Sequence, residues 1–326
     1  MAAVYRPGRA LTGVSTYAET LKTALAGHIE LEFMKQPPGD GFDLIHFIDI
    51  KSAKPADFAG KSVPVIADLH DYYWSEVKAI PGPDAPVRMF LQSGRRPRYQ
   101  QIIQAASAVI VHSKAVAKHV QGKKVFNVPI AIDFEKFRGP LDQDREQMVL
   151  LVGRDAWRKG LGTLINALRM LTPEFPSVRV EVAGKDYLHN RIWASIMALG
   201  LDVKFIGELD QDRLARKYRE AMVIYLGSWQ EGFGLSLAEG MAAGCVAVGS
   251  TAGGIPEVAE DGLSGILFTA GDEVELSAKL RAMFETPELR KRFSAAGQRR
   301  VKEMLSFDKM REALLKAYEE VLKVGG

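Results

Sequence analysis

The feature that most constrains the fold of this chain is a regular alternation of short apolar runs with longer segments of helical spacing. Nine runs of five to seven residues are typical of strands, at 42–48, 63–69, 107–112, 124–129, 147–153, 178–184, 203–207, 222–227 and 245–250. Segments such as 161–171 and 212–222 lie between them and carry apolar residues at positions i, i+3 and i+4. Because such alternation joins parallel strands through crossover helices, it predicts an α/β fold with parallel sheets covered on both faces.

A chain of 326 residues is long for one core and comfortable for two domains. The stretch 131–147 interrupts the alternation with charged residues and a Gly-Pro pair, which is typical of a linker. We therefore expect two Rossmann-like domains, 1–140 and 141–326, with an interdomain cleft at the carboxyl ends of the strands. The last helical segment, 307–323, is compatible with packing on either domain, including a return to the N-terminal one.

The single cysteine, Cys245, excludes an intramolecular disulfide and suits a reducing compartment. It stands among small apolar residues, where a buried thiol is expected. The N-terminus lacks the apolar core of a signal peptide, and no run of about 18 apolar residues occurs. We expect a cytoplasmic protein, either free or peripheral at the inner face of the membrane.

Positive charge is concentrated in the N-terminal part of the chain. Residues 1–140 hold 18 Lys and Arg against 13 Asp and Glu. Within them, residues 88–124 contain no acid and eight cations, namely Arg88, Arg95, Arg96, Arg98, Lys114, Lys118, Lys123 and Lys124. Such a region attracts a phosphate-bearing substrate or an anionic membrane surface, and a merely solvated surface explains it equally well. We expect no nucleic-acid partner.

The segment VGRDAWRKGL, residues 152–161, places two cations just beyond a predicted strand. Arg154 offers bidentate contacts and Lys159 supplies a point charge, and together they suit a diphosphate. Solvated cations are common on protein surfaces, so this segment gains weight only beside a second motif.

That second motif is EGFGLSLAEG, residues 231–240. Its glycines predict a loop that carries Glu231 and a helix that begins near Gly234 or Leu235, with Glu239 in the second turn. Backbone N–H groups at a helix start bind anionic oxygens, and carboxylates accept hydrogen bonds from sugar or ribose hydroxyls. The two motifs together predict a site for a ligand with phosphate and hydroxyl groups. Helix capping and an exposed polar face are the structural alternative for both glutamates.

The run from 203 to 268 closely resembles the retaining glycosyltransferases of family 4, which have the GT-B fold. It contains the Glu-x7-Glu signature, an Ala-x-Gly segment, GGIPEV and EDGLSGILF in the family's order. VGRDAWRKG resembles the family's Val-Gly-Arg…Lys-Gly loop. Looser matches recur nearer the N-terminus in LTGVSTYAETL (11–21), FDLIHF (42–47), ADLHDYYW (67–74), VIVHSKAV (109–116) and AIDFEKF (131–137).

The resemblance implies that a hexose is transferred from a nucleotide-diphosphate sugar to an acceptor hydroxyl with retention of the anomeric configuration. The C-terminal domain would bind the donor, and the N-terminal domain would bind a sugar, lipid-linked or phosphorylated acceptor. The family's reaction is pictured as a front-face attack in which the leaving phosphate takes the acceptor's proton, and Glu231 as a nucleophile stays open. No metal and no cofactor are expected besides the donor substrate.

The resemblance also assigns roles to residues of the C-terminal part. Arg154 and Lys159 would bind the diphosphate and stabilise the charge that grows on it as it leaves. The donor sugar would face Glu231 and the backbone amides that follow it. These donor-binding positions are Phe233, Gly234 and Leu235, and they lead to Glu239, which would hold the ribose hydroxyls.

Three further positions follow from the resemblance alone. Gly13 would bring a backbone N–H to the phosphates, and His70 would lie near the donor sugar as a catalytic residue. The base would rest near Gly184 and the loop after Gly207. The chain departs from the family's pattern in loops: Thr12 precedes Gly13 where a second glycine is usual, and Val246 replaces a proline. These departures remove no charged residue.

Other functions are less compatible with the sequence. The Asp-x-Asp triplets at 142–144 and 210–212 resemble metal–nucleotide motifs, but Asp210 precedes a helical pattern and is better explained as an N-cap. The segments that follow the strands do not spell Gly-x-Gly-x-x-Gly, which argues against a hydride-transfer enzyme. The alternative from another class is a catalytically silent GT-B pseudoenzyme that acts as a binding or partner module. The intact set of cations and glutamates argues against it.

Overall fold

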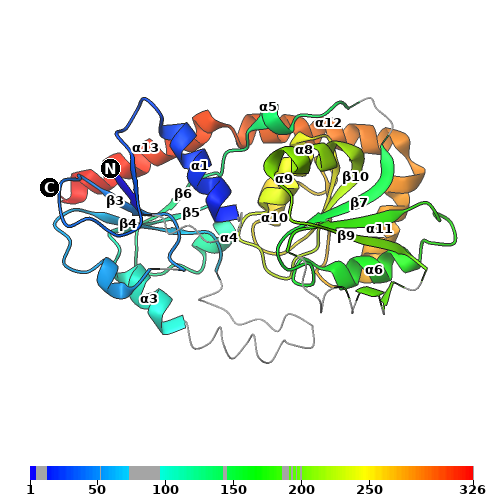
Figure 1. Cartoon of the computed structure of the whole chain (residues 1–326), viewed down its shortest axis with the longest axis horizontal. Coiled ribbons are helices and arrows are strands. Elements are labelled where there is room, and N and C mark those ends of the chain that lie inside the picture. Colours follow the sequence, from blue (N-terminus) through cyan, green and yellow to red (C-terminus); the bar gives the residue numbers. More distant parts are fainter. Residues whose placement is uncertain are drawn as a thin grey trace. The chain divides into compact units, whose positions relative to one another are not determined.

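The computed structural model describes residues 1–4, 13–51, 53–72, 96–141, 145–185, 191, 194–195, 197–198 and 200–325. The chain divides into two compact units. The first comprises Met1–Ala131 together with Leu305–Gly326, and the second comprises Ile132–Met304. Each unit is built on a six-stranded sheet (Figure 1). The neighbouring strands within each sheet are parallel, as the sequence predicts.

The sheet of the first unit has the strand order β2-β1-β3-β4-β5-β6. Its strands are β1 (Ala2–Val4), β2 (Glu32–Met34), β3 (Ile45–Phe47), β4 (Val65–Leu69), β5 (Ala108–Val111) and β6 (Val125–Asn127). Its helices are α1 (Gly13–Leu25), the 3-10 turn η1 (Pro55–Asp57), α3 (Arg96–Ala105), α4 (Lys114–Ala117) and α13 (Phe307–Gly325). The C-terminal helix therefore belongs to the first unit.

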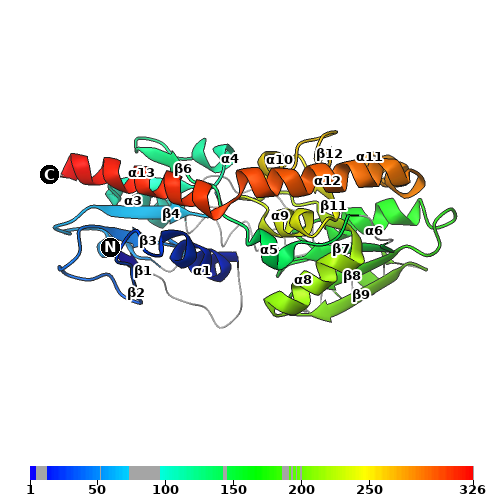
Figure 2. The same ribbon diagram turned by 90° about the horizontal axis from the view of Figure 1, so that it is seen from above.

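The two faces of this sheet differ in chemistry because side chains alternate along each strand. One face is apolar: Phe47, Ala67 and Val109 pack there with Ile102 of α3. The opposite face carries His46, Asp68 and Ile110 among its residues, since the strand register pairs His46 with Ile66 and Asp68 with Ile110. Helices α1 and α13 contact each other (Figure 2) and supply the side chains that meet this polar face.

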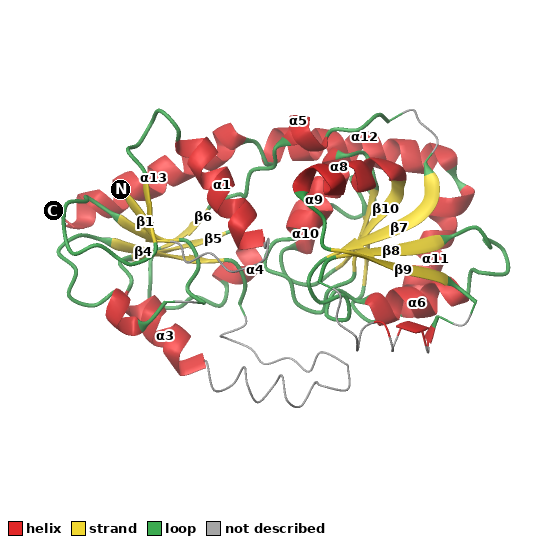
Figure 3. Ribbon diagram, viewed as in Figure 1, coloured by secondary structure: helices red, strands yellow, loops and turns green. Residues whose placement is uncertain are grey.

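The sheet of the second unit has the order β12-β11-β10-β7-β8-β9. Its strands are β7 (Glu146–Val152), β8 (Arg179–Ala183), β9 (Asp202–Gly207), β10 (Ala221–Leu226), β11 (Val246–Ser250) and β12 (Ile266–Phe268). Its helices are α5 (Phe134–Phe137), α6 (Leu161–Arg169), α8 (Gln211–Glu220), α9 (Leu235–Ala242), α10 (Ile255–Val258), α11 (Glu273–Glu285) and α12 (Pro287–Met304) (Figure 3). The chain winds outward from β7 to β9 and then returns to β10 beside β7. Ligands of doubly wound sheets bind at this reversal.

All nine predicted runs form strands, so the α/β prediction is confirmed. The strands β1, β2 and β12 were not predicted, because three residues are too few to display an alternating pattern. Asp210 caps α8 as expected, since its side chain accepts a hydrogen bond of 2.8 Å from the Arg213 amide. The triplet at 142–144 lies outside the described residues.

The stretch predicted as a linker is fastened to the second unit. Its first turn, α5, is capped by Asp133, whose carboxylate accepts a hydrogen bond of 3.1 Å from the Lys136 amide. Arg219 of α8 donates to the carbonyl of Arg138 at 3.0 Å, and Gln298 of α12 donates to that of Gly139 at 2.7 Å. The second unit therefore begins at Ile132, before the predicted boundary between 140 and 141.

Candidate functional site

The predicted diphosphate-binding and sugar-binding motifs meet in the second unit, where the strand order reverses. Lys159 lies in the loop after β7, and Glu231 lies in the loop after β10. Strands β7 and β10 are neighbours in the sheet. The carboxyl ends of neighbouring parallel strands open on the same edge, so the fold itself brings the two loops together.

Backbone contacts fasten the two loops to each other. The Gly227 amide donates to the Lys159 carbonyl at 3.0 Å. The buried hydroxyl of Tyr225, in β10, donates to the Gly160 carbonyl at 3.0 Å. The Lys159 side chain runs across Gly153, where an added Cβ would lie 3.1 Å from its Cε. These contacts fix the path of the Lys159 side chain in the ligand-free protein.

The centre of the site is an ion pair. The Lys159 ammonium donates to Oε2 of Glu231, and the Ser228 hydroxyl donates to the same oxygen at 3.0 Å. The two paired side chains are only 13% and 14% exposed. An ion pair shielded to this degree is screened far less than a surface pair.

Electrostatics keep Glu231 ionised. Burial by itself would raise the pKa of Glu231, but the ammonium of Lys159 and the guanidinium of Arg158 act in the opposite direction. With the hydrogen bonds from Lys159 and Ser228, they hold the pKa of this carboxyl below its ordinary value. Glu231 therefore neutralises Lys159 in the ligand-free protein.

Arg154 lies in the same loop as Lys159, and its side chain is exposed. The loop passes close to Gly184, just after β8: a Cβ on Gly184 would lie 2.0 Å from the Gly153 carbonyl oxygen. Gly184 has φ +146°, which also favours glycine. Its amide donates to the Gly207 carbonyl at 2.9 Å. The two predicted base-binding positions are thus bonded to each other.

The loop that carries Glu231 rests on the glycine pair of GGIPEV. The Gly254 amide donates to the Glu231 carbonyl at 3.0 Å. A Cβ on Gly253, which has φ +58°, would lie 1.9 Å from that carbonyl oxygen. Only glycine permits this approach, so the resemblance motif has a structural purpose: it holds the backbone of Glu231.

Helix α9 begins at Leu235, and Glu239 lies in its second turn, as predicted. The amides of the first turn have no partner inside the helix, and Phe233 and Gly234 lead directly into them. Glu239 is 6% exposed, so the alternative of an exposed polar face is wrong for it. The Tyr218 hydroxyl donates to its Oε2 at 2.8 Å. Burial raises the pKa of Glu239 to about 7, although the Tyr218 bond acts the other way.

The remaining predicted residues, Gly13 and His70, belong to the first unit. Gly13 is the first residue of α1. His70 directly follows β4, and its side chain is 11% exposed. Its Nε2 donates to the Ile48 carbonyl at 2.7 Å. Burial lowers the pKa of His70 to about 3 because the attraction of Asp68 does not offset it.

The same unit contains a buried polar cluster that the sequence reasoning missed. Asp68 and His112 are fully buried, with Oδ1 and Nε2 2.8 Å apart. His46 donates from Nε2 to the other oxygen of Asp68 at 3.1 Å, and its Nδ1 lies 2.9 Å from the Tyr318 hydroxyl. The available signal was three polar residues at inward positions of otherwise apolar runs.

The basic region 88–124 is described from residue 96 onward. Arg98 donates to the carbonyl of Lys51 at 2.8 Å, and Lys124 pairs with Glu320 at 2.5 Å. Arg96, Lys114 and Lys118 are exposed. Arg88 and Arg95 lie outside the described residues. In the part of the chain that the structure describes, no helix is long and apolar enough to cross a membrane.

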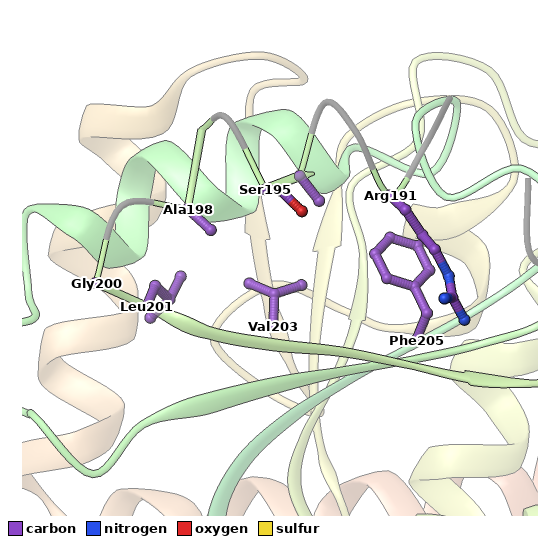
Figure 4. Close-up of a pocket in the computed structure, with 8 residues that line it drawn as sticks. Arg191, Ser195, Ala198, Gly200, Leu201, Val203 and Phe205 are labelled. Carbon is purple, nitrogen blue, oxygen red and sulfur yellow. The ribbon is translucent and has the colours of Figure 1, made fainter. Parts of the chain in front are cut away.

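A cavity of about 370 Å³ lies elsewhere, beside the edge strand β9 of the second unit (Figure 4). Val203 and Phe205 line it from the strand, and Ser195 and Ala198 line it from the facing segment, with Arg191 beside the Phe205 ring. None of the predicted site residues is among the described residues that line it. It is therefore separate from the Lys159–Glu231 centre.

The family model described as glycosyl transferases group 1 matches residues 133–300, more than half of the chain. The chain belongs to this family. The match covers the two loops just described, with both paired residues and the α9 helix.

Similar proteins agree with this assignment. The chain is 28% identical over 295 residues to a phosphatidyl-myo-inositol mannosyltransferase of Mycolicibacterium smegmatis, which covers 87% of the chain and 72% of that protein. It is 28% identical over 206 residues to an MMP α-(1→4)-mannosyltransferase of Mycolicibacterium hassiacum, covering 62% of the chain. The match spans about half the length of that relative, 50%.

Solved structures share the architecture. A sucrose-phosphate synthase from Thermosynechococcus elongatus superposes with a TM-score of 0.77, at 19% identity and 99% coverage of both chains. Anabaena HepE in complex with UDP and glucose gives a TM-score of 0.72, at 15% identity, and covers 98% of this chain and 99% of that one. The group 1 chain therefore has the GT-B fold.

Proposed function

We propose that this protein transfers a hexose from a nucleotide-diphosphate sugar to an acceptor hydroxyl with retention of the anomeric configuration, as family 4 glycosyltransferases do. The observation that carries the proposal is the Lys159–Glu231 ion pair at the strand reversal of the second unit. A cation held there with its own counter-ion can bind a diphosphate and still leave a carboxylate for sugar hydroxyls.

The reaction would begin when the donor's diphosphate reaches Lys159 and Arg154. The bond from the anomeric carbon to the β-phosphate oxygen breaks, and the acceptor oxygen bonds to the same face of that carbon. The acceptor's proton passes to the departing phosphate oxygen, which needs no protein base. Lys159 and Arg154 oppose the charge that grows on this group, and such preorganised stabilisation is usually the largest contribution to catalysis.

The other residues of the second unit would orient the donor. Amides at the start of α9, at Phe233, Gly234 and Leu235, are suited to phosphate and sugar oxygens. Glu239, when ionised, would accept hydrogen bonds from the ribose hydroxyls. Glu231 would accept hydrogen bonds from the sugar hydroxyls once the diphosphate also binds the Lys159 ammonium. No metal is required for this set.

In the first unit, Gly13 is proposed to approach the donor phosphates and His70 the donor sugar. The acceptor is proposed to be a sugar, lipid-linked or phosphorylated molecule that reaches the exposed cations Arg96, Lys114 and Lys118. An anionic membrane surface could meet the same cations, at the cytoplasmic side. Relatives named for mannose transfer and for inositol-bearing substrates support mannose and inositol phosphates as the first compounds to test.

The test is a reaction panel. The protein is incubated with UDP-, GDP-, ADP- and TDP-hexoses and with sugar, inositol-phosphate and phosphatidylinositol acceptors, and the products are identified by NMR. We expect one donor to give a product whose anomeric configuration equals that of the donor. An inverted product would refute retention. Tight diphosphate binding without any product would instead favour the pseudoenzyme.

A further inference from the structure

The buried polar cluster of the first unit contains more hydrogen-bonding atoms than it satisfies. Within the described part of the chain, three of its buried atoms make no hydrogen bond of good geometry, although Tyr17 and His112 both lie against the Asp68 carboxylate: Oδ1 of Asp68, Nε2 of His112 and the hydroxyl oxygen of Tyr17. Buried polar atoms are nearly always satisfied in folded proteins. Three orphans in one cluster therefore need an explanation.

The hydrogen-bond partners of His112 make the problem sharper. Its Nδ1 lies 2.9 Å from the Val128 carbonyl. A carbonyl only accepts, so Nδ1 carries the proton, and in a neutral imidazole Nε2 then presents a lone pair. That lone pair lies 2.8 Å from the carboxylate oxygen of Asp68, without the alignment of a hydrogen bond. Two electron-rich atoms at this distance repel unless a positive charge sits against both.

A third donor is close to the same oxygen. Nε2 of His70 lies 3.8 Å from Oδ1 of Asp68. One ligand atom from each of Asp68, His70 and His112 falls within 4.8 Å of the other two. Atoms that share one ion through bonds of about 2.1 Å are separated by comparable distances. His70 would give up the hydrogen bond from Nε2 to the Ile48 carbonyl, its proton would move to Nδ1, and the lone pair of Nε2 would bind the ion.

The surroundings have the form of a metal site's outer shell. Val128 holds His112 by its remote nitrogen, and His46 holds the second oxygen of Asp68 at 3.1 Å. Partners of this kind fix the orientation of metal ligands. The Tyr17 ring closes the cluster, with its centroid 4.6 Å from that of His70 and 4.8 Å from that of His112.

We propose that Asp68, His70 and His112 bind one divalent transition-metal cation of the zinc class. Two imidazoles and a carboxylate suit such ions, whereas Mg²⁺ and Ca²⁺ prefer sets made of oxygen alone. The cation would balance the charge of Asp68 and tie the carboxyl ends of β4 and β5 together beneath α1. The proposal is independent of the diphosphate site in the second unit, but it competes with the role of His70 at the donor sugar, because a ring nitrogen that binds the cation cannot also contact the sugar.

The spacing of the three residues along the chain does not indicate a metal site. Asp68 and His70 stand two residues apart, but His112 follows 42 residues after His70 and joins them only because β5 pairs with β4. The expectation that no metal is bound came from the family resemblance. The pairing of β4 with β5 brings the three residues together, which their spacing in the sequence does not show.

The test uses the full-length protein after dialysis against a chelator. Co²⁺ is titrated while its visible absorption is recorded, and Zn²⁺ is then added in competition. We expect one equivalent of Co²⁺ to give intense bands typical of a coordination number of four or five, and one equivalent of Zn²⁺ to abolish them. His112→Gln and Asp68→Asn should each weaken binding at least tenfold. His28→Ala, which removes an exposed histidine at the end of α1, should leave it unchanged.

A second measurement needs no variant, so it holds if a variant does not fold. The ring nitrogens of the histidines are observed by ¹⁵N NMR with and without Zn²⁺. A shift of His112 Nε2 on addition of Zn²⁺ supports the site. The proposal is overturned if His112 is protonated on both nitrogens and Zn²⁺ leaves its signals unchanged, because a proton then bridges Asp68 and His112. Cobalt bands that persist equally in His112→Gln would overturn it as well.

Discussion

In the second unit the charged side chains of the candidate site stand in loops beyond the strands, whereas in the first unit the polar cluster stands largely within the strands themselves. Lys159 and Glu231 retain some contact with solvent, at 13% and 14% exposure, while Asp68 and His112 have none. A loop site can exchange one partner for another when a ligand arrives. In a cluster inside the sheet, the fold fixes the positions of the side chains. Their charges and hydrogen bonds must then be satisfied within the protein interior.

This difference teaches where a ligand can act. The Lys159–Glu231 pair is balanced without a ligand, so a diphosphate must compete with Glu231 for the ammonium. The Asp68–His112 contact is not balanced by hydrogen bonding. The Lys159–Glu231 pair is therefore expected to respond to substrates, and the Asp68 cluster to ions that stabilise it.

The largest effect is expected from Lys159→Ala. It removes the cation that faces the departing diphosphate and leaves Glu231 without its ion-pair partner. We expect kcat/KM with the best donor to fall by about 10²- to 10³-fold, the usual cost of losing one stabilising contact to the transition state. Steady-state kinetics would measure this, with Lys204→Ala as the control, since that lysine pairs with Asp202 on the edge strand and is 60% exposed. Equal losses in both variants would place the site elsewhere.

Glu239→Gln should change the pH dependence of stability. The folded protein keeps a proton on Glu239 up to pH about 7, whereas the unfolded chain releases it near the ordinary pKa of about 4.5. The difference in pKa therefore costs no stability below pH about 4.5, and it lowers the free energy of unfolding by roughly 3 kcal/mol in total as the pH rises to about 7. Denaturant unfolding between pH 4.5 and 8 should show a flatter profile for Glu239→Gln. The exposed Glu303→Gln should keep the wild-type profile.

The same group links pH to ligand binding. Ribose hydroxyls donate hydrogen bonds, so they should prefer the ionised form of Glu239. Affinity for the cognate nucleoside diphosphate should rise about tenfold as the pH increases from 6 to 8, which corresponds to about 1.4 kcal/mol. Calorimetry at both values tests this, and Glu239→Gln should abolish the increase. An increase that survives in Glu239→Gln would belong to another group.

Gly253→Ala should damage the second unit through the backbone of Glu231. The new Cβ would meet the Glu231 carbonyl oxygen, and the residue has a positive φ. Gly262 is the matched control, because it also has a positive φ, +72°, but has open space around it. We expect Gly262→Ala to cost about 1 kcal/mol and Gly253→Ala roughly 3 kcal/mol, measured as free energies of unfolding. Equal costs would mean that the contact with Glu231 contributes little.

The smallest effect compares one tyrosine from each unit. Tyr318→Phe removes the partner of His46 in the first unit, and Tyr225→Phe removes the hydroxyl that holds Gly160 beside Lys159 in the second. Each should lower stability by about 1 kcal/mol. Only Tyr225→Phe should also weaken diphosphate binding. The reverse pattern would contradict the assignment of the donor site to the second unit.

The sequence predicted the second unit better than the first, for physical reasons. Strands of five to seven residues repeat their pattern often enough to be recognised, and the loop motifs after β7 and β10 stand beside each other because of the strand order. The ion pair of Lys159 with Glu231 could not be predicted from spacing, since 72 residues separate the two. Nor could the burial of Glu239, which depends on Tyr218 of another helix.

In the first unit the decisive features are tertiary. His46, Asp68 and His112 come from three strands, and only the register places them on one face. Tyr318 reaches His46 from the far end of the chain, 272 residues away. Local patterns do not encode such contacts, so the sequence did not predict this cluster.

The most direct test of the central claim is calorimetric binding of UDP, GDP, ADP and TDP to the wild-type protein and to Lys159→Ala, each with and without EDTA. The account predicts that one diphosphate binds the wild type, that EDTA does not change its affinity, and that Lys159→Ala weakens it at least tenfold. The Lys204→Ala control should bind as the wild type does. Unchanged binding by Lys159→Ala would contradict the claim that the loops after β7 and β10 form the donor site.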